Sequence, residues 1–425
     1  MANNFDSNIT RPLARVFTEK FESERILSKN VNTQLLTGRF NPSTGDTVDF
    51  KRPTDYVSVR TPKGDVSGET PSDIITGKSS GIVQDYFTAF IDFDEADEAI
   101  KMDQLPELID PLAIRIKTDL ELDFGRFMLR NTALLAGTVG TPVSNWDHIA
   151  EAGAIMQSSG IPMDDDWLYT VNPHTQRALA SDQRSLGAGG VAGKLISEAQ
   201  RKATIDENFA GMKVMTATTL PSYTTDTEVD RVGTLSADPD VTYVTAKDSM
   251  QQTLLVQDFG NDLEIRAGET LRITGVNRLN LSTRQVILDE TGTEIVFTGT
   301  VVSDVTLSGT GTGSIVITGP ALFEATGAFN TASRAAITGD IITLLGSDST
   351  IIQPNLFWHK QAFSIGSVPI KKLHSTDTLS TTVDGLMFRV SKGVGFLENE
   401  QKIRIDFRPA YSVLNPFFAG QGFGS

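Results

Sequence analysis

Between residues 227 and 349 the sequence changes character, and this change limits the architectures open to the chain. The segment consists of short runs rich in Thr, Val and Ile, such as LEIRAGETLRITGV, EIVFTGTVV and VTLSGTGTGSIVITG, punctuated by glycine. Such runs predict short β-strands joined by turns, and helical periodicity nearly vanishes. Because the residues on both sides mix helical and strand patterns, we predict an all-β module inserted into a continuous α+β domain.

The strongest helical pattern lies at residues 110–135. Asp110 is a candidate N-cap, and Pro111 suits the first turn of a helix. The apolar positions recur at helical spacing, at Leu112, Ile116, Leu120, Phe124 and Phe127. At 1.5 Å per residue, about 25 residues extend roughly 37 Å, the width of a small domain. We therefore predict one long helix that acts as a strut.

Other local patterns complete the α+β prediction. Residues 81–96 alternate apolar and polar side chains and predict one long strand. A short amphipathic helix is predicted near the N-terminus, capped by Thr10. Further on, the sequence predicts a helix near 145–158, a strand at 167–172 and a helix after the letters NPHTQ.

Residues 46–82, which we call the ribbon, are too polar for a core strand and too orderly for a disordered loop. Their centre, FKRPTDYVSVRTPKGDVSG, alternates valine with polar residues and is broken by proline and glycine. This stretch carries four bases, Lys51, Arg52, Arg60 and Lys63, against two acids, Asp55 and Asp65. The pattern predicts a stiff, basic, extended element.

The charge distribution suggests two interpretations of the ribbon. The chain has a formal net charge of −16, and residues 92–123 supply half of it, with eleven acids against three bases. In one interpretation the basic ribbon and the acidic segment are separately solvated faces. In the other, the ribbon of one subunit lies on the acidic segment of the next. The residues alone give the two equal weight.

Composition excludes several classes of protein. The excess of acids, 53 against 37 bases, argues against a nucleic-acid-binding surface, because phosphate contacts require an excess of Lys and Arg. The absence of cysteine removes disulfides, thiolate nucleophiles and cysteine-based zinc sites, and fits a reducing cytoplasm. No run approaches the ~18 apolar residues of a membrane span, and the N-terminus lacks the pattern of a signal peptide. We expect a soluble chain made in the cytoplasm, with no membrane partner.

Motifs that could carry chemistry are weak. GKSSG matches the serine-nucleophile pattern at Ser79, but a strand pattern follows it rather than a helix, and the four histidines (His148, His174, His359 and His374) show no triad context. GAGGVA at 187–192 follows no strand, so a dinucleotide loop is not predicted. MDDDW at 163–167 and DFDEADE at 92–98 lack the spacing of a calcium loop. We therefore expect no catalytic residue, no cofactor and no metal site.

Several long stretches resemble one known family. They are LLTGRFNPSTGDTVDFKRP, VRTPKGDVSGETPSDIITGKSSGIVQDY, EADEAIKMDQL, QPNLFWHKQAF, SVPIKKLHS and FRPAYSVLNPFFAGQGFG. Together with the order of elements, they resemble the major coat proteins of Salmonella-type short-tailed phages over essentially the whole chain. These proteins have the Hong Kong 97 capsid fold with an added insertion domain, so the resemblance implies that α+β architecture here.

The resemblance also implies a domain organisation. The ribbon matches the extended loop that reaches across an adjacent subunit, and residues 103–135 match the spine helix. The implied domains are an N-terminal arm (1–45), the extended loop (46–82), a peripheral strand and spine helix (83–136), the first part of an axial domain (137–226), a β-barrel-like insertion domain (227–349) and a return through the axial and peripheral domains (350–425).

With that placement, the interpretation in which subunits contact each other through the ribbon becomes the favoured one. The interface residues expected on the loop side are Lys51, Arg52, Arg60 and Lys63. Those expected on the acidic receiving side are Asp94, Glu95, Asp97, Glu98 and Glu107. The N-terminal arm is a candidate scaffold contact through Glu19, Glu22 and Glu24.

The implied function is that of a major capsid protein. Copies are expected to form hexamers and pentamers, assembling with a scaffolding protein into an icosahedral procapsid, with T=7 the expected size. A portal protein at one vertex and encapsidated double-stranded DNA, bound without sequence specificity, are the other implied partners. The implied location is the virion, after assembly in the host cytoplasm. The alternative class is a β-rich decoration or attachment protein, which the Thr/Gly-rich residues 290–319 favour locally.

One departure from the family concerns the insertion domain. Some relatives carry a long acidic loop there that bridges capsomers. The corresponding stretch here, TYVTAKDSMQQTLLVQD, is compact, with only Lys247, Asp248 and Asp258 charged. We therefore expect this chain to lack that bridge.

Overall fold

The computed structural model describes most of the chain in two compact units. The described residues are 25–36, 40, 45–61, 63–94, 105–164, 166–186, 202–203, 205, 208–325, 327–370, 377–383, 386–395 and 400–425. The first unit comprises residues up to 49, 80–125 and 363–413, and the second comprises 50–79, 126–362 and 414–425. Among the described residues, no helix is both long and apolar enough to cross a membrane.

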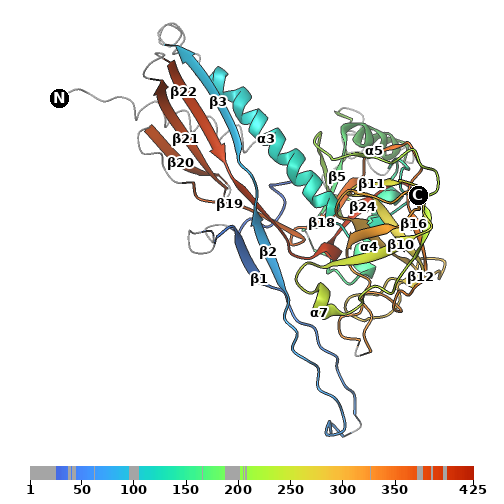
Figure 1. The fold of residues 1–425 in the computed structure, drawn as a ribbon. Coiled ribbons are helices and arrows are strands. Elements are labelled where there is room, and N and C mark those ends of the chain that lie inside the picture. The colour runs from blue at the N-terminus through green and yellow to red at the C-terminus, as the bar shows by residue number, and fades with distance from the viewer. Residues whose placement is uncertain are drawn as a thin grey trace. The chain divides into compact units, whose positions relative to one another are not determined.

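A four-stranded antiparallel sheet forms one part of the first unit (Figure 1). Its order is β20 (Asp377–Val383), β21 (Leu386–Gly395), β22 (Glu400–Phe407) and β3 (Phe87–Asp94). Along β3, partly buried Phe87, Ala89 and Ile91 alternate with exposed residues, as the sequence predicts. The prediction of a single strand over 81–96 is wrong in its continuity, because residues 84–86 separate β3 from β2 (Lys78–Val83).

A second sheet of the order β1–β2–β23–β19 carries the ends of the ribbon. It consists of β1 (Thr47–Lys51), β2, β23 (Pro409–Val413) and β19 (Phe363–Ser367). Buried Leu36 packs against the backbone at Gly81 and Gly366, where an added Cβ would lie 2.4 Å from Leu36 atoms. Glycine at both positions therefore lets the N-terminal segment approach this sheet closely.

Helix α3 (Leu105–Arg130) differs from its predicted bounds at both ends. Pro111 lies inside the helix rather than in its first turn. The N–H that proline lacks would have bonded a carbonyl close to the helix start, so the sequence tolerates it there. Ile116, Leu120 and Phe124 of the predicted stripe are buried. The helix ends at Arg130, and the chain continues into a short strand, β4 (Leu134–Ala136).

Glu121 joins α3 to residues 26–28, which belong to the predicted N-terminal arm. Its buried carboxylate accepts the backbone N–H groups of Ile26 at 3.2 Å, Leu27 at 2.7 Å and Ser28 at 3.0 Å, and also the Ser28 hydroxyl. Three backbone donors on one carboxylate fix the direction in which the chain arrives at the helix.

The second unit contains a mixed six-stranded sheet. Its order is β4, β24 (Ala419–Gly422), β18 (Asn355–His359), β5 (Trp167–Val171), β7 (Met212–Thr216) and β6 (Asn208–Phe209). Helices α4 (Trp146–Ser158) and α5 (Pro173–Leu186) accompany it, and Asn145 caps α4. The predicted helix near 145–158 and strand at 167–172 are confirmed, while α5 begins inside NPHTQ.

The second unit also contains a closed six-stranded barrel. Around the barrel the strands are β10 (Gln251–Gln257), β15 (Gly313–Thr318), β13 (Val296–Val301), β12 (Thr270–Asn277), β16 (Ile341–Leu344) and β9 (Val232–Leu235). The smaller elements of the second unit are β8 (Tyr223–Thr224), α7 (Tyr243–Ala246), β11 (Glu264–Ile265), β14 (Val305–Thr306), β17 (Ile351–Ile352) and η3 (Pro416–Phe418). Buried Leu254, Phe297 and Ile315 belong to its core. The α+β class with an inserted barrel is confirmed, and the boundaries at 227 and 349 stay predictions.

Arg278 joins the barrel to the rest of the second unit. Its guanidinium is fully enclosed and donates to the carbonyls of Thr298 at 2.7 Å and Ala133 at 2.8 Å. The rings of Phe297 and Phe417 lie 5.2 Å and 5.9 Å from it. Burial lowers the pKa of Arg278 to about 10. Carbonyl dipoles and aromatic faces thus stabilise this charge where no carboxylate reaches it in the described structure.

A buried carboxylate organises the sheet of the first unit and leads to a prediction. Asp406 is inaccessible to solvent and accepts from Arg389 Nε at 3.0 Å, Arg404 Nε at 2.6 Å and Thr88 Oγ1 at 2.8 Å. Burial alone would raise the pKa of Asp406, but the bonds from the two arginines and Thr88 hold it below its usual value. At pH 7, Asp406→Asn should lower the free energy of unfolding by about 3 kcal/mol, because it removes the buried carboxylate that accepts from the Arg389 guanidinium.

Urea unfolding as a function of pH is the appropriate measurement. Because the folded pKa lies below the unfolded value of about 3.9, the advantage of wild type over Asp406→Asn is complete above that pH. It should shrink as the pH falls through the folded pKa. Asp85→Asn, on the exposed link between β2 and β3, is the control and should change stability by less than about 0.5 kcal/mol. A gap between wild type and Asp406→Asn that stays constant down to pH 3 would contradict the assignment.

Candidate assembly interface

Between β1 and β2 the ribbon has almost no structure of its own. Figure 1 draws this part as a narrow blue loop without arrows, and its described residues between 52 and 77 form no strand. Within this part, the Val57 N–H donates to the Ser72 hydroxyl at 3.2 Å. An extended backbone without a ladder presents unpaired N–H and C=O groups, which are ready to pair with another surface.

The ribbon also exposes large apolar side chains. Tyr56, Val57, Val59, Val66 and Ile74 are all exposed, and Ile74 reaches 75%. Apolar side chains gathered on one short extended segment are typical of a surface that another chain covers. The ribbon therefore combines free backbone groups, apolar contacts and positive charge.

The four basic residues predicted on the ribbon divide into two groups. Lys51, Arg60 and Lys63 are exposed. Arg52 is buried, and its guanidinium donates to the carbonyls of Leu414 at 2.5 Å and Lys78 at 3.1 Å of its own chain. Burial lowers the pKa of Arg52 to about 10, partly offset by Tyr243 and Asp248. Arg52 thus fixes the ribbon to its own subunit, and the proposed contact between subunits involves only the other three bases.

Where the ribbon leaves β1 and returns to β2, residues 52–55 and 77–78 form a root that the barrel insert fixes. The Arg52 N–H donates to the Gly77 carbonyl at 2.9 Å. The Asp248 carboxylate accepts the Lys78 N–H at 2.9 Å, and Arg284 forms an ion pair with Asp55. Sequence reasoning missed these contacts because their partners are 170 and 229 positions apart.

Gly77 is required at this root. An added Cβ would lie 2.5 Å from the carbonyl oxygen of Lys247, which follows α7 in the insert. The ring of Tyr243 in α7 stacks on Phe329 with centroids 3.8 Å apart. This stacking helps to hold α7, and with it Lys247, in position. The stretch predicted to be compact contains α7 and β10 and forms part of the support for the ribbon.

The predicted acidic receiving face is not described at the level of side chains. Glu95, Asp97 and Glu98 lie outside the described residues, and for Asp94 and Glu107 only the backbone is described. Also outside are the predicted N-terminal helix, the scaffold candidates Glu19, Glu22 and Glu24, His374 and the GAGGVA stretch at 187–192. The contact between a ribbon and this face therefore stays a prediction.

Ser79 has the environment of a structural residue. It is buried as the second residue of β2, and the strand continues after it instead of turning sharply into a helix. A serine nucleophile of the GxSxG type needs that turn to expose its hydroxyl.

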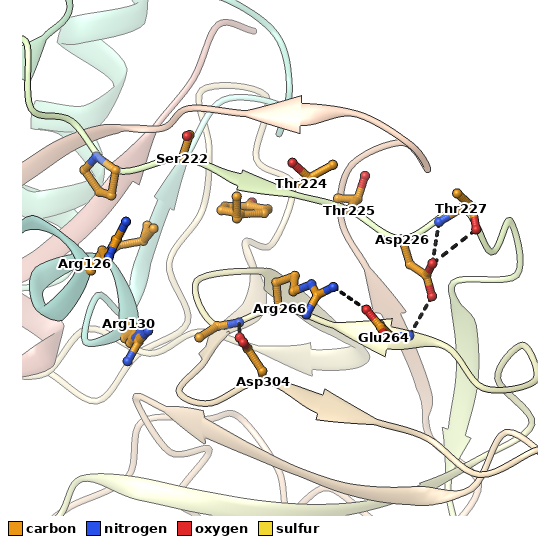
Figure 2. A pocket seen from close by; sticks show the side chains of 14 residues that line it. Arg126, Arg130, Ser222, Thr224, Thr225, Asp226, Thr227, Glu264, Arg266 and Asp304 are labelled. Carbon is orange, nitrogen blue, oxygen red and sulfur yellow. Dashed lines mark hydrogen bonds and ion pairs between the residues drawn. The ribbon is translucent and has the colours of Figure 1, made fainter. Parts of the chain in front are cut away.

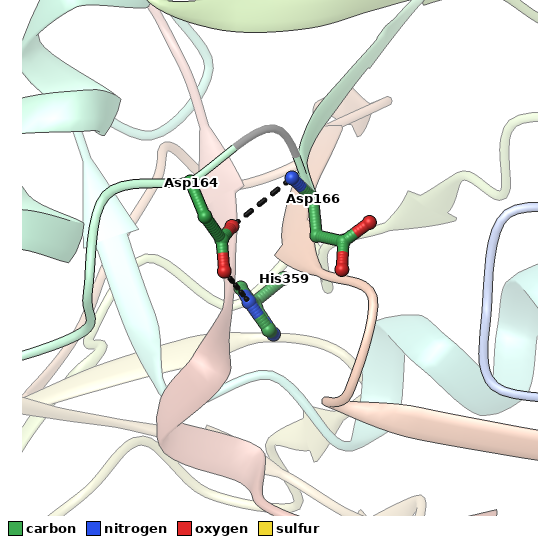
Figure 3. A group of neighbouring side chains, drawn as sticks. All are labelled: Asp164, Asp166 and His359. Atoms are coloured by element: carbon green, nitrogen blue, oxygen red, sulfur yellow. Dashed lines mark hydrogen bonds and ion pairs between the residues drawn. The ribbon is translucent and has the colours of Figure 1, made fainter.

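His359 forms a cluster with Asp164 and Asp166 (Figure 3). The strands β5 and β18 bring them together, because Trp167 pairs with His359. His359 Nε2 lies 3.1 Å from Asp164 Oδ2, and its Nδ1 accepts the Gln361 N–H at 3.1 Å. Burial alone would raise the pKa of Asp164, but its bonds with His359 and the Asp166 N–H lower it.

This hydrogen-bond pattern does not suit a metal ligand. Because Nδ1 accepts from a backbone N–H, the neutral ring carries its proton on Nε2 and donates it to Asp164. A metal on Nε2 would require the proton on Nδ1, where it would point at the Gln361 N–H. The cluster therefore joins a turn to a strand, and sequence patterns cannot predict it because Asp164 and His359 are 195 positions apart.

Comparisons with known proteins agree along the whole chain. A family model described as P22 coat protein - gene protein 5 matches residues 1–424. A protein of Acyrthosiphon pisum secondary endosymbiont phage 1 named major capsid protein is 31% identical over 428 residues, covering 100% of both chains. Similar solved structures include one of Mycobacterium phage Che8 (12% identity, TM-score 0.47, 95% and 93% of the two chains) and the capsid of cyanophage P-SCSP1u (11%, 0.43, 95% and 88%).

The root of the ribbon yields a prediction that needs no assembly. Arg284→Ala removes the ion pair with Asp55, so the ribbon should open more often. A partly exposed ion pair contributes about 0.2–1 kcal/mol, which corresponds to roughly 1.5- to 5-fold faster trypsin cleavage after Arg60 and Lys63 in the isolated subunit. Arg272→Ala, at an exposed position on β12, is the matched control. Equal cleavage rates in all three proteins would show that Arg284 does not restrain the ribbon.

Proposed function

This chain belongs to the P22 coat protein family and is a phage major capsid protein, and from that premise we propose how it assembles. Copies associate as hexamers and pentamers, around a scaffolding protein, into an icosahedral procapsid of T=7 size. The procapsid matures into the shell around the double-stranded DNA genome, with a portal protein at one vertex. Assembly takes place in the host cytoplasm, and the product is the virion capsid.

The ribbon is the observation that supports this proposal most directly. Its free backbone groups, exposed apolar side chains and three exposed bases lack a partner surface in the described part of one subunit. In a closed shell, each ribbon would find that surface on the adjacent subunit, where Asp94, Glu95, Asp97, Glu98 and Glu107 supply the opposite charge. The contact would set the register between subunits through charge and cover the apolar residues at the same time.

Shell assembly requires many modest contacts rather than a few strong ones. Each subunit contributes the same interfaces repeatedly. In a closed shell all of them form at once, so their free energies add up. Weak individual contacts allow a misplaced subunit to leave before the shell closes. Maturation would follow as rigid-body rotation of domains, with the spine helix α3 and the ribbon transmitting the movement between subunits.

The interior of such a shell must hold DNA without binding it tightly. The acidic balance of the chain, 53 acids against 37 bases, disfavours adhesion to phosphates. This composition suits contact with packaged DNA that is independent of sequence. The role is structural, as it is in the family, and the arrangements at Ser79 and His359 fit structural residues.

Expression with and without the scaffolding protein of the same phage tests the proposal. Electron microscopy should show closed, uniform shells when both proteins are present and aberrant assemblies when the scaffold is omitted. This result follows if the subunit supplies the contacts and the scaffold supplies curvature. Stable monomers or fibrous trimers under both conditions would instead favour a decoration or attachment protein.

Charge reversal on the ribbon tests the contact between subunits. Arg60→Glu combined with Lys63→Glu should leave the melting temperature of the subunit unchanged, because both side chains are exposed. The yield of shells in sedimentation should fall by about tenfold or more, since each reversed charge would face the acidic receiving side. Arg177→Glu combined with Arg184→Glu, on exposed positions of α5, is the matched control. Equal losses in both double variants would mean that net charge matters and the position on the ribbon does not.

A further inference from the structure

A polar recess of about 450 Å³ lies in the second unit where α3 ends (Figure 2). The last turns of α3 supply Arg126 and Arg130 to its wall. Residues 221–227, the end of β11 with the turn after it, and Asp304 supply the rest. The wall carries three arginines and three acids, so its formal charges sum to zero. The partners of each charged group nevertheless differ.

The three acids of the wall already have donors within the chain. Asp226 accepts the Glu264 N–H at 2.7 Å and the Thr227 N–H at 2.6 Å, which lowers its pKa. Asp304 accepts the Ala267 N–H at 2.7 Å, and Glu264 forms an ion pair with Arg266. These carboxylates therefore stabilise the loops of the wall through hydrogen bonds, and Glu264 neutralises the charge of Arg266.

Arg126 and Arg130 remain unmatched. Both are exposed, and neither has a hydrogen-bond or ion-pair partner in the part of the chain that the structure describes. They are four positions apart on α3, so the two like charges lie on the same side of the helix and repel each other when no counter-ion is present. Figure 2 shows them together at one side of the recess, with Asp226 and Glu264 at the other.

We propose that this arginine recess binds a carboxylate presented by an acidic segment of a second copy of this chain. Two guanidinium groups one turn apart suit bidentate contact with a carboxylate. The volume of about 450 Å³ admits one or two side chains. The chain itself carries an excess of acids to supply the ligand, and the proposed shell places copy against copy. The inference therefore rests on the proposed function and assigns it a second contact between subunits, separate from the ribbon.

The first test changes the charge of the recess. In the full chain co-expressed with scaffold, Arg126→Glu combined with Arg130→Glu should raise the subunit concentration at which shells appear by about tenfold or more. Arg126→Lys combined with Arg130→Lys keeps the charge and should recover part of that loss. Arg177→Glu combined with Arg184→Glu controls for net charge. Because the mutated side chains are exposed, the isolated variant subunit should melt at the same temperature as the control variant. A loss of shells at an unchanged melting temperature would then come from a lost contact and not from misfolding.

The second test identifies the occupant. Because the chain has no cysteine, Ser222→Cys places a unique thiol at an exposed position of the recess wall. Labelled with a maleimide photo-crosslinker and assembled with isotope-labelled wild-type subunits, it should yield cross-links to an acidic peptide of the labelled copy. Cross-links to the scaffolding protein, to DNA or only within the same copy would overturn the proposal.

The two levels of failure are distinguishable. If wild type forms no shells with scaffold, the proposed function is wrong. If wild type forms shells and the Arg126→Glu, Arg130→Glu protein forms them at the same concentration, only the arginine recess is wrong.

Discussion

The root of the ribbon is the constraint on which the proposed assembly depends. A segment without a ladder of its own has many conformations, and each would be lost on docking at a cost in entropy. Arg52 reduces that number by joining the two ends of the ribbon to the carbonyls of Lys78 and Leu414. Pro53 and Pro71 restrict the backbone further. The ribbon thus leaves its own subunit in a limited set of directions.

The barrel insert contributes to this restraint, which gives it a role inside the subunit. Asp248 and Arg284 fix the root, and the segment around α7 approaches Gly77 too closely for any side chain. The insert is in turn joined to the six-stranded sheet region through Arg278, and Gln421 of β24 donates to the Gly268 carbonyl at 2.9 Å. A displacement of Asp248 or Arg284 in the insert would therefore alter the polar contacts that hold the root of the ribbon.

The sequence predicted elements whose signal is local. The barrel strands, α4 and β5 follow from hydrophobic pattern and capping over a few residues. The predicted start of α3 at Asp110 is wrong because Pro111 suits a first turn but is also tolerated one turn further into the helix. The root of the ribbon could not be predicted, since Asp55 and Arg284 meet only after the insert has folded. The same holds for the pair of Asp164 and His359, which depends on β5 lying beside β18.

The arginines fall into two groups that differ in burial and in role. Arg52, Arg278 and Arg389 are buried and bonded within the chain, so their charges stabilise one fold. Arg60, Arg126 and Arg130 are exposed, although the chain as a whole is acidic. In an acidic protein, identical copies repel each other at long range, and a few exposed bases decide where they approach. In the proposed shell, repulsion between whole subunits combined with attraction at defined positions would keep each contact weak and still specify the register between subunits.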